Sequence, residues 1–354
     1  MSKPKILNFA PRGEPEEIQR ALADAGYAFV VGDRAWQDPG GNHEDSLIAA
    51  SRETVALMGT SIRATPISRR VMEASQRLRI VAKYTVGVDD IDVEAASELG
   101  ILVTHAPTEA NCFGVAETTM AVLLATLKKV RERDAAIRAG EWREPHLTAT
   151  YLGARRSDGY PGITIGLVGL GRIGTRVAQL LAPWRVRILA CDPYVEPARF
   201  LLAGVEPVDY ATLLKQSDVV SFHVVLTKET RHMLAERELA MMKPGAVVIN
   251  MARGKLVDEA ALARAIAAGR IAAAAIDAFE EEPLPADSAL RKLGDKVLLS
   301  PHAASFDVGG ELKPGIAWAA RSVLAALSGD VPDSVYNKEV IPRWKERFGG
   351  LSVN

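Results

Sequence analysis

Three kinds of side chain suited to proton transfer and anion binding each follow a short apolar run in the second half of the chain. Arg253 follows GAVVINMA, the acidic run Glu280–Glu282 follows IAAAAIDAF, and His302 follows KVLLSP. An arginine binds a carboxylate through two hydrogen bonds and polarises a neighbouring carbonyl group. A histidine exchanges a proton near neutral pH, and a carboxylate beside it stabilises the imidazolium and fixes its orientation. With a hydride donor, this combination predicts a reductase that acts on the carbonyl group of 2-oxo acids.

Each of these residues has an ordinary structural explanation when it is taken alone. A strand-end arginine is commonly solvated, a histidine before small residues is commonly a structural residue, and an EEE run is commonly an exposed turn. Ligands of open α/β sheets, however, bind beyond the carboxyl ends of the strands. The three kinds of side chain follow a dinucleotide-type glycine loop in order, and this joint occurrence favours the chemical interpretation.

The glycine loop is 169-GLGRIG-174, between the predicted strand TIGLV and the predicted helix TRVAQLL. In this pattern Gly169 permits a tight turn, Gly171 lets the backbone approach a pyrophosphate, and Gly174 lets helix and strand pack closely. The helix start adds unpaired N–H groups, and Arg172 meets the pyrophosphate or is solvated. Asp192 ends the next predicted strand, where a carboxylate binds the ribose hydroxyls and repels a 2′-phosphate. NAD is therefore predicted over NADP, and the alternative is a glycine-rich turn followed by a surface aspartate.

The surrounding elements predict an α/β fold of doubly wound parallel sheets. The first hundred residues alternate strand and helix patterns, which favours a parallel sheet with helices on both faces. One continuous helix is predicted from Asn111 to about Ala139, ended by Gly140 and followed by a surface stretch over 141–162. Six strands follow, the number in a dinucleotide-binding sheet, and a helix at 318–329 is expected to pack back on the first unit. The strands are predicted at 5–10, 27–31, 55–60 and 78–85, and then at 164–171, 185–192, 218–225, 245–252, 271–279 and 296–301.

Length and composition set the remaining limits. A chain of 354 residues exceeds one ordinary domain, so two are expected. The net charge of -1 gives no electrostatic case for nucleic acid or an anionic membrane. Cys112 and Cys191 form no metal-binding or disulfide spacing and indicate a reducing compartment. No metal is predicted. No signal core or membrane-length apolar run is recognised, so a cytoplasmic protein is expected.

With these motifs in place, the sequence resembles the D-isomer-specific 2-hydroxyacid dehydrogenase family, including its phosphoglycerate dehydrogenase-like members. The likeness covers nearly the whole chain. Besides the glycine loop, it is carried by TVGVDDIDVEAASELGILVTHAP (85–107), SDVVSFHVVLTKETRHML (217–234), MKPGAVVINMARGKLVDEAAL (242–262), AAIDAFEEEPLP (274–285) and SPHAAS (300–305).

The resemblance implies roles for individual residues. Arg253 would bind the substrate, Glu282 would be the partner carboxylate, and His302 would be the acid/base, with Glu280 and Glu281 as neighbours. Asp277 would meet the nicotinamide amide or its ribose, and the alternative is a carboxylate that caps a local segment. The other implied cofactor positions are Gly169, Gly171, Arg172, Ile173, Gly174, Asp192, His223, Thr230, Met251, Ala252 and Thr119. The implied substrate positions are Tyr84, Thr85, Val86, Gly87 and Arg253, with the backbone around Val86–Gly87 receiving the substrate carboxylate.

The family also implies two Rossmann-like or flavodoxin-like domains with a cleft between them. Residues 1–110 plus 305–354 would form a discontinuous substrate-binding domain, and 111–304 would form the NAD-binding Rossmann domain. Closure of the two would exclude water. A homodimer is implied, with the helix at 113–139 and Trp142 as interface candidates.

The implied activity is the NAD-dependent, reversible interconversion of a 2-oxo acid and a D-2-hydroxy acid. D-3-phosphoglycerate dehydrogenase and glyoxylate or hydroxypyruvate reductase are alternatives, and an NAD-sensing, corepressor-like interaction protein is the alternative that is not an enzyme. Three departures bear on this choice. PHAAS (301–305) stands where the family often has PHIGG or PHIAG, the segment 143–160 is longer than usual, and Arg63 is shifted from the position of a phosphate-binding residue.

Overall fold

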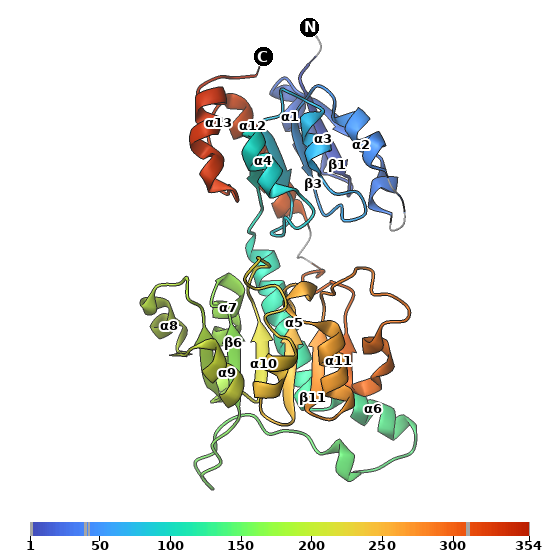
Figure 1. The fold of residues 1–354 in the computed structure, drawn as a ribbon, viewed down its shortest axis with the longest axis vertical. Helices are drawn as coiled ribbons and strands as arrows, with labels where there is room; N and C mark the ends of the chain where they lie inside the picture. Colours follow the sequence, from blue (N-terminus) through green and yellow to red (C-terminus); the bar gives the residue numbers. More distant parts are fainter. Residues whose placement is uncertain (1–2, 39–40, 42, 309–311, 354) are drawn as a thin grey trace. The chain divides into compact units, whose positions relative to one another are not determined.

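The computed structural model describes residues 3–38, 41, 43–308 and 312–353. The chain forms two compact units (Figure 1). The first comprises Met1–Asn111 and Gly309–Asn354, and the second comprises Cys112–Val308. The sequence placed these boundaries after residues 110 and 304.

The first unit is built on a five-stranded, wholly parallel sheet of order β2-β1-β3-β4-β5. This is the flavodoxin-like order. The sequence analysis did not predict β5, which has only three residues. The strands are β1 Lys5–Ala10, β2 Ala28–Val31, β3 Thr54–Gly59, β4 Ile80–Lys83 and β5 Leu102–Thr104.

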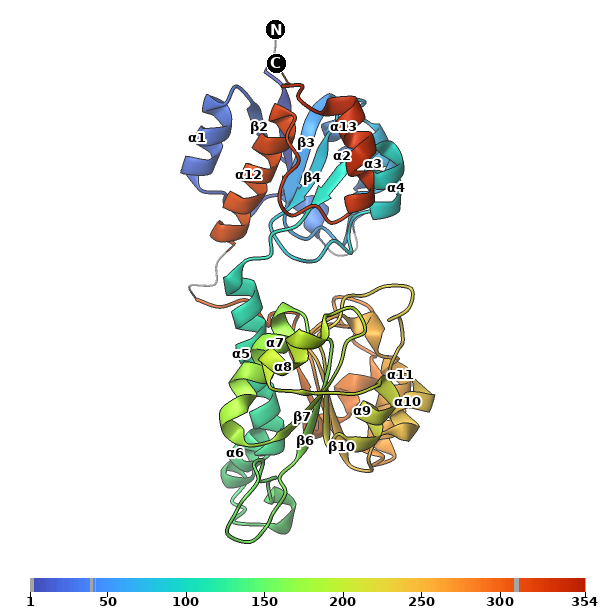
Figure 2. The ribbon, with the colours of Figure 1, turned by 90° about the vertical axis from the view of Figure 1, so that its left-hand side faces the viewer.

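Helices cover both faces of this sheet, and each face has its own apolar core (Figure 2). Helix α12, Lys313–Ser328, packs against β3 and β4, so the prediction that this helix returns to the first unit is confirmed. Trp344 of α13 is fully buried there, and its indole Nε1 donates to the Arg79 carbonyl at 3.0 Å. One face carries α1 Glu16–Asp24, α12 Lys313–Ser328 and α13 Ile341–Phe348, and the other carries α2 Glu44–Ser51, α3 Arg69–Glu73 and α4 Val93–Leu99.

The second unit has a parallel sheet of seven strands in the order β12-β11-β10-β9-β6-β7-β8. Six of them were predicted. The seventh, β8, is a two-residue edge strand, Glu206–Pro207, and an edge is where a sheet tolerates proline. When β6 is counted as the first strand, the order matches the 3-2-1-4-5-6 order of a dinucleotide-binding sheet. The additional strand, β12, lies at one edge. The other strands are β6 Thr164–Val168, β7 Arg187–Cys191, β9 Val219–Phe222, β10 Ala246–Asn250, β11 Ile271–Ile276 and β12 Val297–Leu299.

Two helical layers enclose this sheet (Figure 2). One layer contains α5 Glu109–Leu127, α7 Arg172–Leu181 and α8 Pro197–Ala203, and the other contains α9 Tyr210–Gln216, α10 Glu236–Met241 and α11 Glu259–Ala267. The short 3₁₀ segments of the chain are η1 Arg34–Gln37, η2 Pro145–Leu147, η3 Ala182–Trp184, η4 Gly254–Leu256, η5 Ala289–Lys292, η6 Gly294–Lys296 and η7 Lys338–Val340.

The single long helix predicted after Asn111 is wrong, because the chain forms α5 and then α6, Val130–Arg138. Lys129 separates them with a φ of +52°, which is outside the helical region. The break is fixed from outside the helix, since Leu127 O accepts the N–H of Thr150 at 2.9 Å. By length and composition α5 is apolar enough to cross a membrane. Half of it is buried in the unit, and its buried side chains belong to the core beside β6.

Capping residues set helix boundaries in both units. Asp92 accepts the N–H of Ala95 at 2.9 Å and begins α4, while Gly100 ends that helix with a φ of +72°. Asp258 accepts the N–H of Ala261 at 2.8 Å and begins α11.

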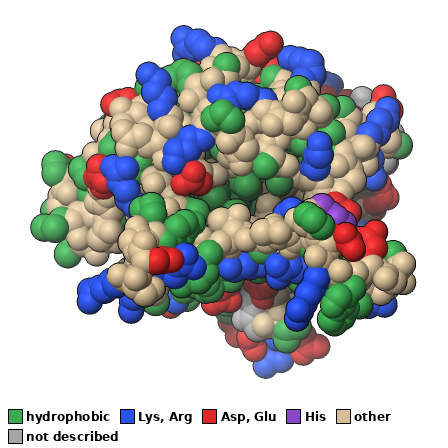
Figure 3. Space-filling model, turned by 90° about the horizontal axis from the view of Figure 1, so that it is seen from below, with side chains coloured by type: hydrophobic (Ala, Val, Ile, Leu, Met, Phe, Trp, Pro, Cys, Tyr) green, Lys and Arg blue, Asp and Glu red, His purple; other side chains and the backbone are tan. Residues whose placement is uncertain are grey.

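The face of the molecule drawn in Figure 3 has basic and acidic side chains interspersed with hydrophobic ones.

Candidate active site

The glycine loop joins β6 to α7, and each of its glycines meets a different constraint. Gly169 has a φ of +96°, which side chains rarely adopt. A Cβ on Gly174 would lie 2.1 Å from the Gly169 carbonyl oxygen, so the close packing of helix on loop requires glycine. A Cβ on Gly171, the N-cap of α7, would meet no atom of the described residues within 4 Å. Protein atoms therefore crowd Gly169 and Gly174, whereas the space beside Gly171 is open.

Asp192 follows β7 and is joined to the same loop. Its carboxylate accepts the N–H of Leu170 at 2.8 Å and the N–H of Tyr194 at 3.0 Å. An acidic residue beside the glycine loop, together with the unhindered approach at Gly171 and the start of α7, fits the adenosine and pyrophosphate part of a dinucleotide. Arg172 and Ile173 form the first turn of α7.

His302 and Glu282 are in direct contact in the second unit. Imidazole Nδ1 of His302 lies 2.8 Å from Glu282 Oε1, and that oxygen also accepts the N–H of Phe279 at 3.0 Å. Both side chains are largely covered, with 30% of His302 and 15% of Glu282 exposed. His302 has a φ of +52°, and its N–H donates to Asp277 O at 2.8 Å, so strand-end backbone fixes the residue. A carboxylate on Nδ1 leaves Nε2 as the nitrogen that can exchange a proton.

Arg253 follows β10 in a segment that touches the loop after β11. A Cβ on Gly254 would lie 1.8 Å from the Phe279 carbonyl carbon, so the two backbones approach closely. The Arg253 guanidinium Nη1 donates to Ala252 O at 2.7 Å, and Asn250 Nδ2 donates to the Arg253 carbonyl at 2.8 Å. The loops that carry Arg253 and Glu282 are thus packed together.

Asp277, at the end of β11, is almost fully buried and binds the segment after His302. Its two carboxylate oxygens accept the N–H groups of Ala303 at 2.8 Å and Ala304 at 3.1 Å. The local capping role that the sequence left open is therefore present. Whether Asp277 also meets the nicotinamide stays a prediction.

The other acidic residues of the EEE run differ from Glu282. Glu280 Oε1 accepts the N–H of Glu259, and Glu259 Oε1 accepts the N–H of Glu280, at 3.0 and 2.6 Å. Glu280 Oε2 also lies 3.2 Å from His232 Nε2. Burial raises the pKa of Glu259 above its ordinary value. Glu281 is exposed. Sequence reasoning did not predict this cluster, and no spacing rule would have indicated it.

The remaining predicted cofactor residues lie in the second unit. His223 follows β9, its Nε2 lies 2.9 Å from Ser221 Oγ, and burial lowers its pKa to about 4, so the ring is neutral at physiological pH. Thr230 Oγ1 accepts the N–H of Thr227 at 2.8 Å and braces the loop after β9. Met251 is buried and Ala252 is half-buried after β10. Thr119 is fully buried in α5, where its hydroxyl donates to Val115 O at 2.7 Å.

The predicted substrate residues of the first unit follow β4. Tyr84 is buried, and this burial raises the pKa of its phenol well above its ordinary value. Thr85, Val86 and Gly87 continue the loop, half-buried. Next to them lies a buried ion pair between Lys83 and Asp90, which the sequence analysis missed. A lysine at the end of an apolar strand, with an aspartate at the far end of the following loop, was the available signal.

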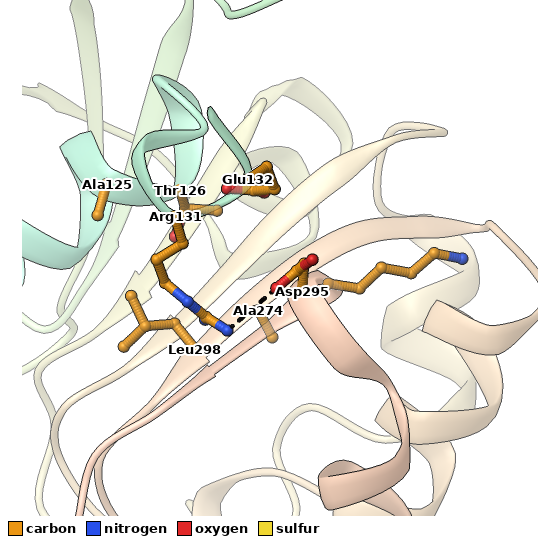
Figure 4. A pocket seen from close by; sticks show the side chains of 8 residues that line it. Ala125, Thr126, Arg131, Glu132, Ala274, Asp295 and Leu298 are labelled. Carbon is orange, nitrogen blue, oxygen red and sulfur yellow. Dashed lines mark hydrogen bonds and ion pairs between the residues drawn. The ribbon is translucent and has the colours of Figure 1, made fainter. Parts of the chain in front are cut away.

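A small hollow borders the amino-terminal part of β12 (Figure 4). Arg131 of α6 reaches Asp295 there, 3.5 Å from its carboxylate. None of the residues that line the hollow is one of the candidate site residues above, so it is not assigned to this site. No group of three or more His, Cys, Asp or Glu side chains suited to a metal occurs among the described residues.

The fold and loop define an NAD-binding α/β protein, and comparison with known proteins gives its family. The family model for the D-isomer specific 2-hydroxyacid dehydrogenase NAD-binding domain matches residues 120–304. The chain is similar to glyoxylate reductase of Thermofilum pendens, with 38% identity over 348 residues that cover 96% of each protein. It is similar to D-3-phosphoglycerate dehydrogenase of Mycobacterium tuberculosis, with 40% identity over 325 residues and 90% of this chain covered. It spans only 58% of that relative's length.

A solved structure supports the same relationship. The glyoxylate reductase from Paecilomyes thermophila superposes with a TM-score of 0.81 at 27% identity, covering 96% of this chain and all of that one. The chain therefore belongs to the D-isomer-specific 2-hydroxyacid dehydrogenase family, and its second unit carries the family's NAD-binding domain.

Proposed function

We propose that this chain is an NAD-dependent enzyme that interconverts a small 2-oxo acid and the matching D-2-hydroxy acid. The observation that carries the proposal is the contact of 2.8 Å between His302 Nδ1 and Glu282 Oε1 at the carboxyl ends of β11 and β12. A histidine oriented in this way by a carboxylate is suited to general acid/base catalysis. It stands on the same sheet as the dinucleotide loop, at the edge where such sheets bind their ligands.

The cofactor would be held by the loop residues Gly169, Gly171 and Gly174, with Asp192 at the adenosine ribose. Bound NADH supplies the hydride that reduces C2 of the 2-oxo acid. His302 donates a proton from Nε2 to the nascent hydroxyl oxygen, and in the reverse direction it accepts that proton. Glu282 stabilises the imidazolium through Nδ1.

Substrate binding is assigned to Arg253 and to the loop after β4. Arg253 would bind the substrate carboxylate and polarise the carbonyl group, since a guanidinium offers paired donors in one plane. The N–H groups around Val86 and Gly87 would receive the carboxylate as well. Tyr84 and Thr85 would shape the pocket.

The assembly and location of the protein are part of the same proposal. We assign a homodimer through the second unit, because Trp142, Val130 and Ile137 on and after α6 are large apolar side chains with half or more of their surface exposed. Cys112 and Cys191, the two cysteines of the chain, form no disulfide, which fits the reducing cytoplasm.

The experiment is an assay of NADH oxidation by the purified chain with glyoxylate, hydroxypyruvate, pyruvate and 3-phosphohydroxypyruvate. We expect turnover on at least one of the first three, with a D-configured product from hydroxypyruvate or pyruvate (glycolate, the product from glyoxylate, has no stereocentre). Turnover only on the phosphorylated acid would identify a phosphoglycerate dehydrogenase. Binding of NADH without turnover on any acid would refute the enzyme and favour an NAD-sensing protein.

A further inference from the structure

Strand β4 ends in a lysine that is completely removed from solvent. Lys83 is 0% exposed, and burial lowers its pKa from the ordinary value. Its ammonium donates to Asp90 Oδ1 at 2.7 Å, to Asp90 Oδ2 at 2.5 Å and to Thr60 O at 2.8 Å. All three donors of the ammonium group are therefore used inside the protein.

Asp90 is also buried, and it binds the segment that follows β3. Its Oδ2 accepts the N–H of Ile62 at 2.7 Å, and its carbonyl accepts the N–H of Ile67 at 2.9 Å. The pair therefore links the end of β4, the turn after β3 and the far end of the loop that follows β4. Burying two charges is costly, and a buried ion pair is weak evidence for stability but well suited to fixing one arrangement of the chain.

The two charged residues flank one short loop. Lys83 stands directly before Tyr84, and Asp90 directly after Asp89, so both ends of Tyr84–Asp89 are anchored to the same ion pair. Inside the loop the carbonyls are engaged, since Thr85 O accepts the N–H of Ala106 at 3.0 Å and Val86 O lies 3.3 Å from His105 Nδ1. Within the part of the chain that the structure describes, the N–H groups of Val86 and Gly87 donate to no protein acceptor. Successive unpaired N–H groups form a site for an anion.

We propose that Lys83 and Asp90 are a positioning pair that holds the Val86–Gly87 amides in the arrangement that binds the substrate carboxylate. The pair acts through the backbone and touches no substrate. This inference rests on the proposed function, because it assumes that the anion at these amides is the carboxylate of the 2-oxo acid. A loop held at both ends presents its donors without reorganisation when the acid binds, and small displacements of such groups are costly to binding and rate.

The test uses Asp90→Asn, Lys83→Met and the double variant in the full chain. Lys243→Met is the matched control, because Lys243 and Asp218 form a half-exposed pair of 2.9 Å in the second unit. For each protein we would measure the dissociation constant of NADH, the dissociation constant of oxamate (a 2-oxo acid analogue) with NADH saturating, KM and kcat for the best 2-oxo acid, and Tm.

We expect each single variant to raise the oxamate dissociation constant and KM by about tenfold to a hundredfold. The affinity for NADH should stay within about twofold, because its loop lies in the other unit. Lys243→Met should leave both constants unchanged. The double variant leaves no buried charge and keeps an acceptor for Ile62, so it should regain Tm while KM stays high. If a single variant does not fold, the double variant still allows the measurement.

Two results would overturn the pair's role. The first is an oxamate affinity and a KM in the variants that are close to those of the parent. The second is a double variant in which KM returns to the parent value together with Tm. Either result would leave the proposed function intact if the parent turns over a 2-oxo acid. A parent that neither turns over any 2-oxo acid nor binds oxamate would overturn both.

Discussion

The carboxylate of Asp277 holds the backbone of Ala303 through a hydrogen bond of 2.8 Å, and this contact fixes the segment that carries His302. The other oxygen of Asp277 accepts the N–H of Ala304, and the carbonyl of Asp277 accepts the N–H of His302. One residue at the end of β11 therefore binds three successive backbone N–H groups after β12. The orientation of the imidazole depends on this connection as well as on Glu282.

The first prediction concerns Asp277→Asn. An amide has a single acceptor oxygen, so one of the two carboxylate bonds is lost, at a cost of about 1–3 kcal/mol for a buried group. We expect Tm to fall and kcat to fall about tenfold, with the dissociation constant of NADH changed less than threefold. Steady-state kinetics and fluorescence titration with NADH measure these quantities. Asp295→Asn, an exposed carboxylate of the same unit, is the control. A loss confined to NADH binding would instead assign Asp277 to the nicotinamide.

The second prediction concerns His302→Ala. Removal of a general acid/base lowers turnover by roughly 10²–10⁴-fold. We expect kcat to fall at least about a hundredfold, with NADH affinity nearly intact because the glycine loop is untouched. Turnover by the variant within a few-fold of the parent would contradict the role of His302.

The sequence predicted those parts of the fold that depend on local pattern. Ten of the twelve strands in the described part of the chain were predicted from short, mostly apolar segments, as expected for buried parallel strands. The strands β5 (Leu-Val-Thr) and β8 (Glu-Pro) were not predicted, since neither is long enough to show a periodicity, although the equally short β12 was predicted from the run Val297–Leu299. The helical pattern around Lys129 also continues without a stop signal, and the break there depends on a contact with Thr150, which is distant in sequence.

The residues of the candidate site also differ in whether a local sequence pattern predicts them. The glycine loop is local, and its geometry agrees with the constraints read from the motif. The choice of Glu282 among three successive glutamates came from the resemblance, because the residues alone do not indicate which carboxylate faces His302. Glu280 turns to Glu259 instead. Lys83 and Asp90 meet only because three segments of the first unit pack around them.

The third prediction concerns the cofactor preference. Asp192→Ala should raise the ratio of kcat/KM with NADPH to that with NADH by about tenfold or more, because the carboxylate that repels a 2′-phosphate is removed. Asp192 also accepts the N–H of Leu170, so alanine loosens the glycine loop. Asp192→Asn keeps an acceptor and removes only the charge, and it should show most of the change in the ratio. An unchanged ratio in both variants would rule out the ribose role.

The fourth prediction follows from His223, whose pKa burial lowers to about 4. The unfolded chain binds a proton at this histidine near pH 6.5, so its contribution to stability is complete above that pH and is lost as pH falls toward 4. Relative to His223→Gln, the parent should lose roughly 2 kcal/mol of unfolding free energy between pH 7.5 and 4.5, a value reduced for solvent screening because the residue is half-buried. Urea denaturation across this range measures the difference. Parallel stability curves would show that His223 titrates normally.

The fifth prediction separates the folding and binding roles of the glycine loop. Alanine at Gly174 would place its Cβ 2.1 Å from the Gly169 carbonyl oxygen, so Gly174→Ala should lower Tm by several degrees, as overpacking costs about 1–3 kcal/mol. Alanine at Gly171 meets no described atom within 4 Å, and the φ of −69° there suits any residue. Gly171→Ala should therefore keep the Tm of the apo protein, yet weaken NADH at least about tenfold by occupying the approach of the pyrophosphate. Calorimetry without cofactor and titration with NADH distinguish the two effects. If Gly171→Ala bound NADH as tightly as the parent, the pyrophosphate would have to lie elsewhere, and the assignment of this loop to the cofactor would be wrong.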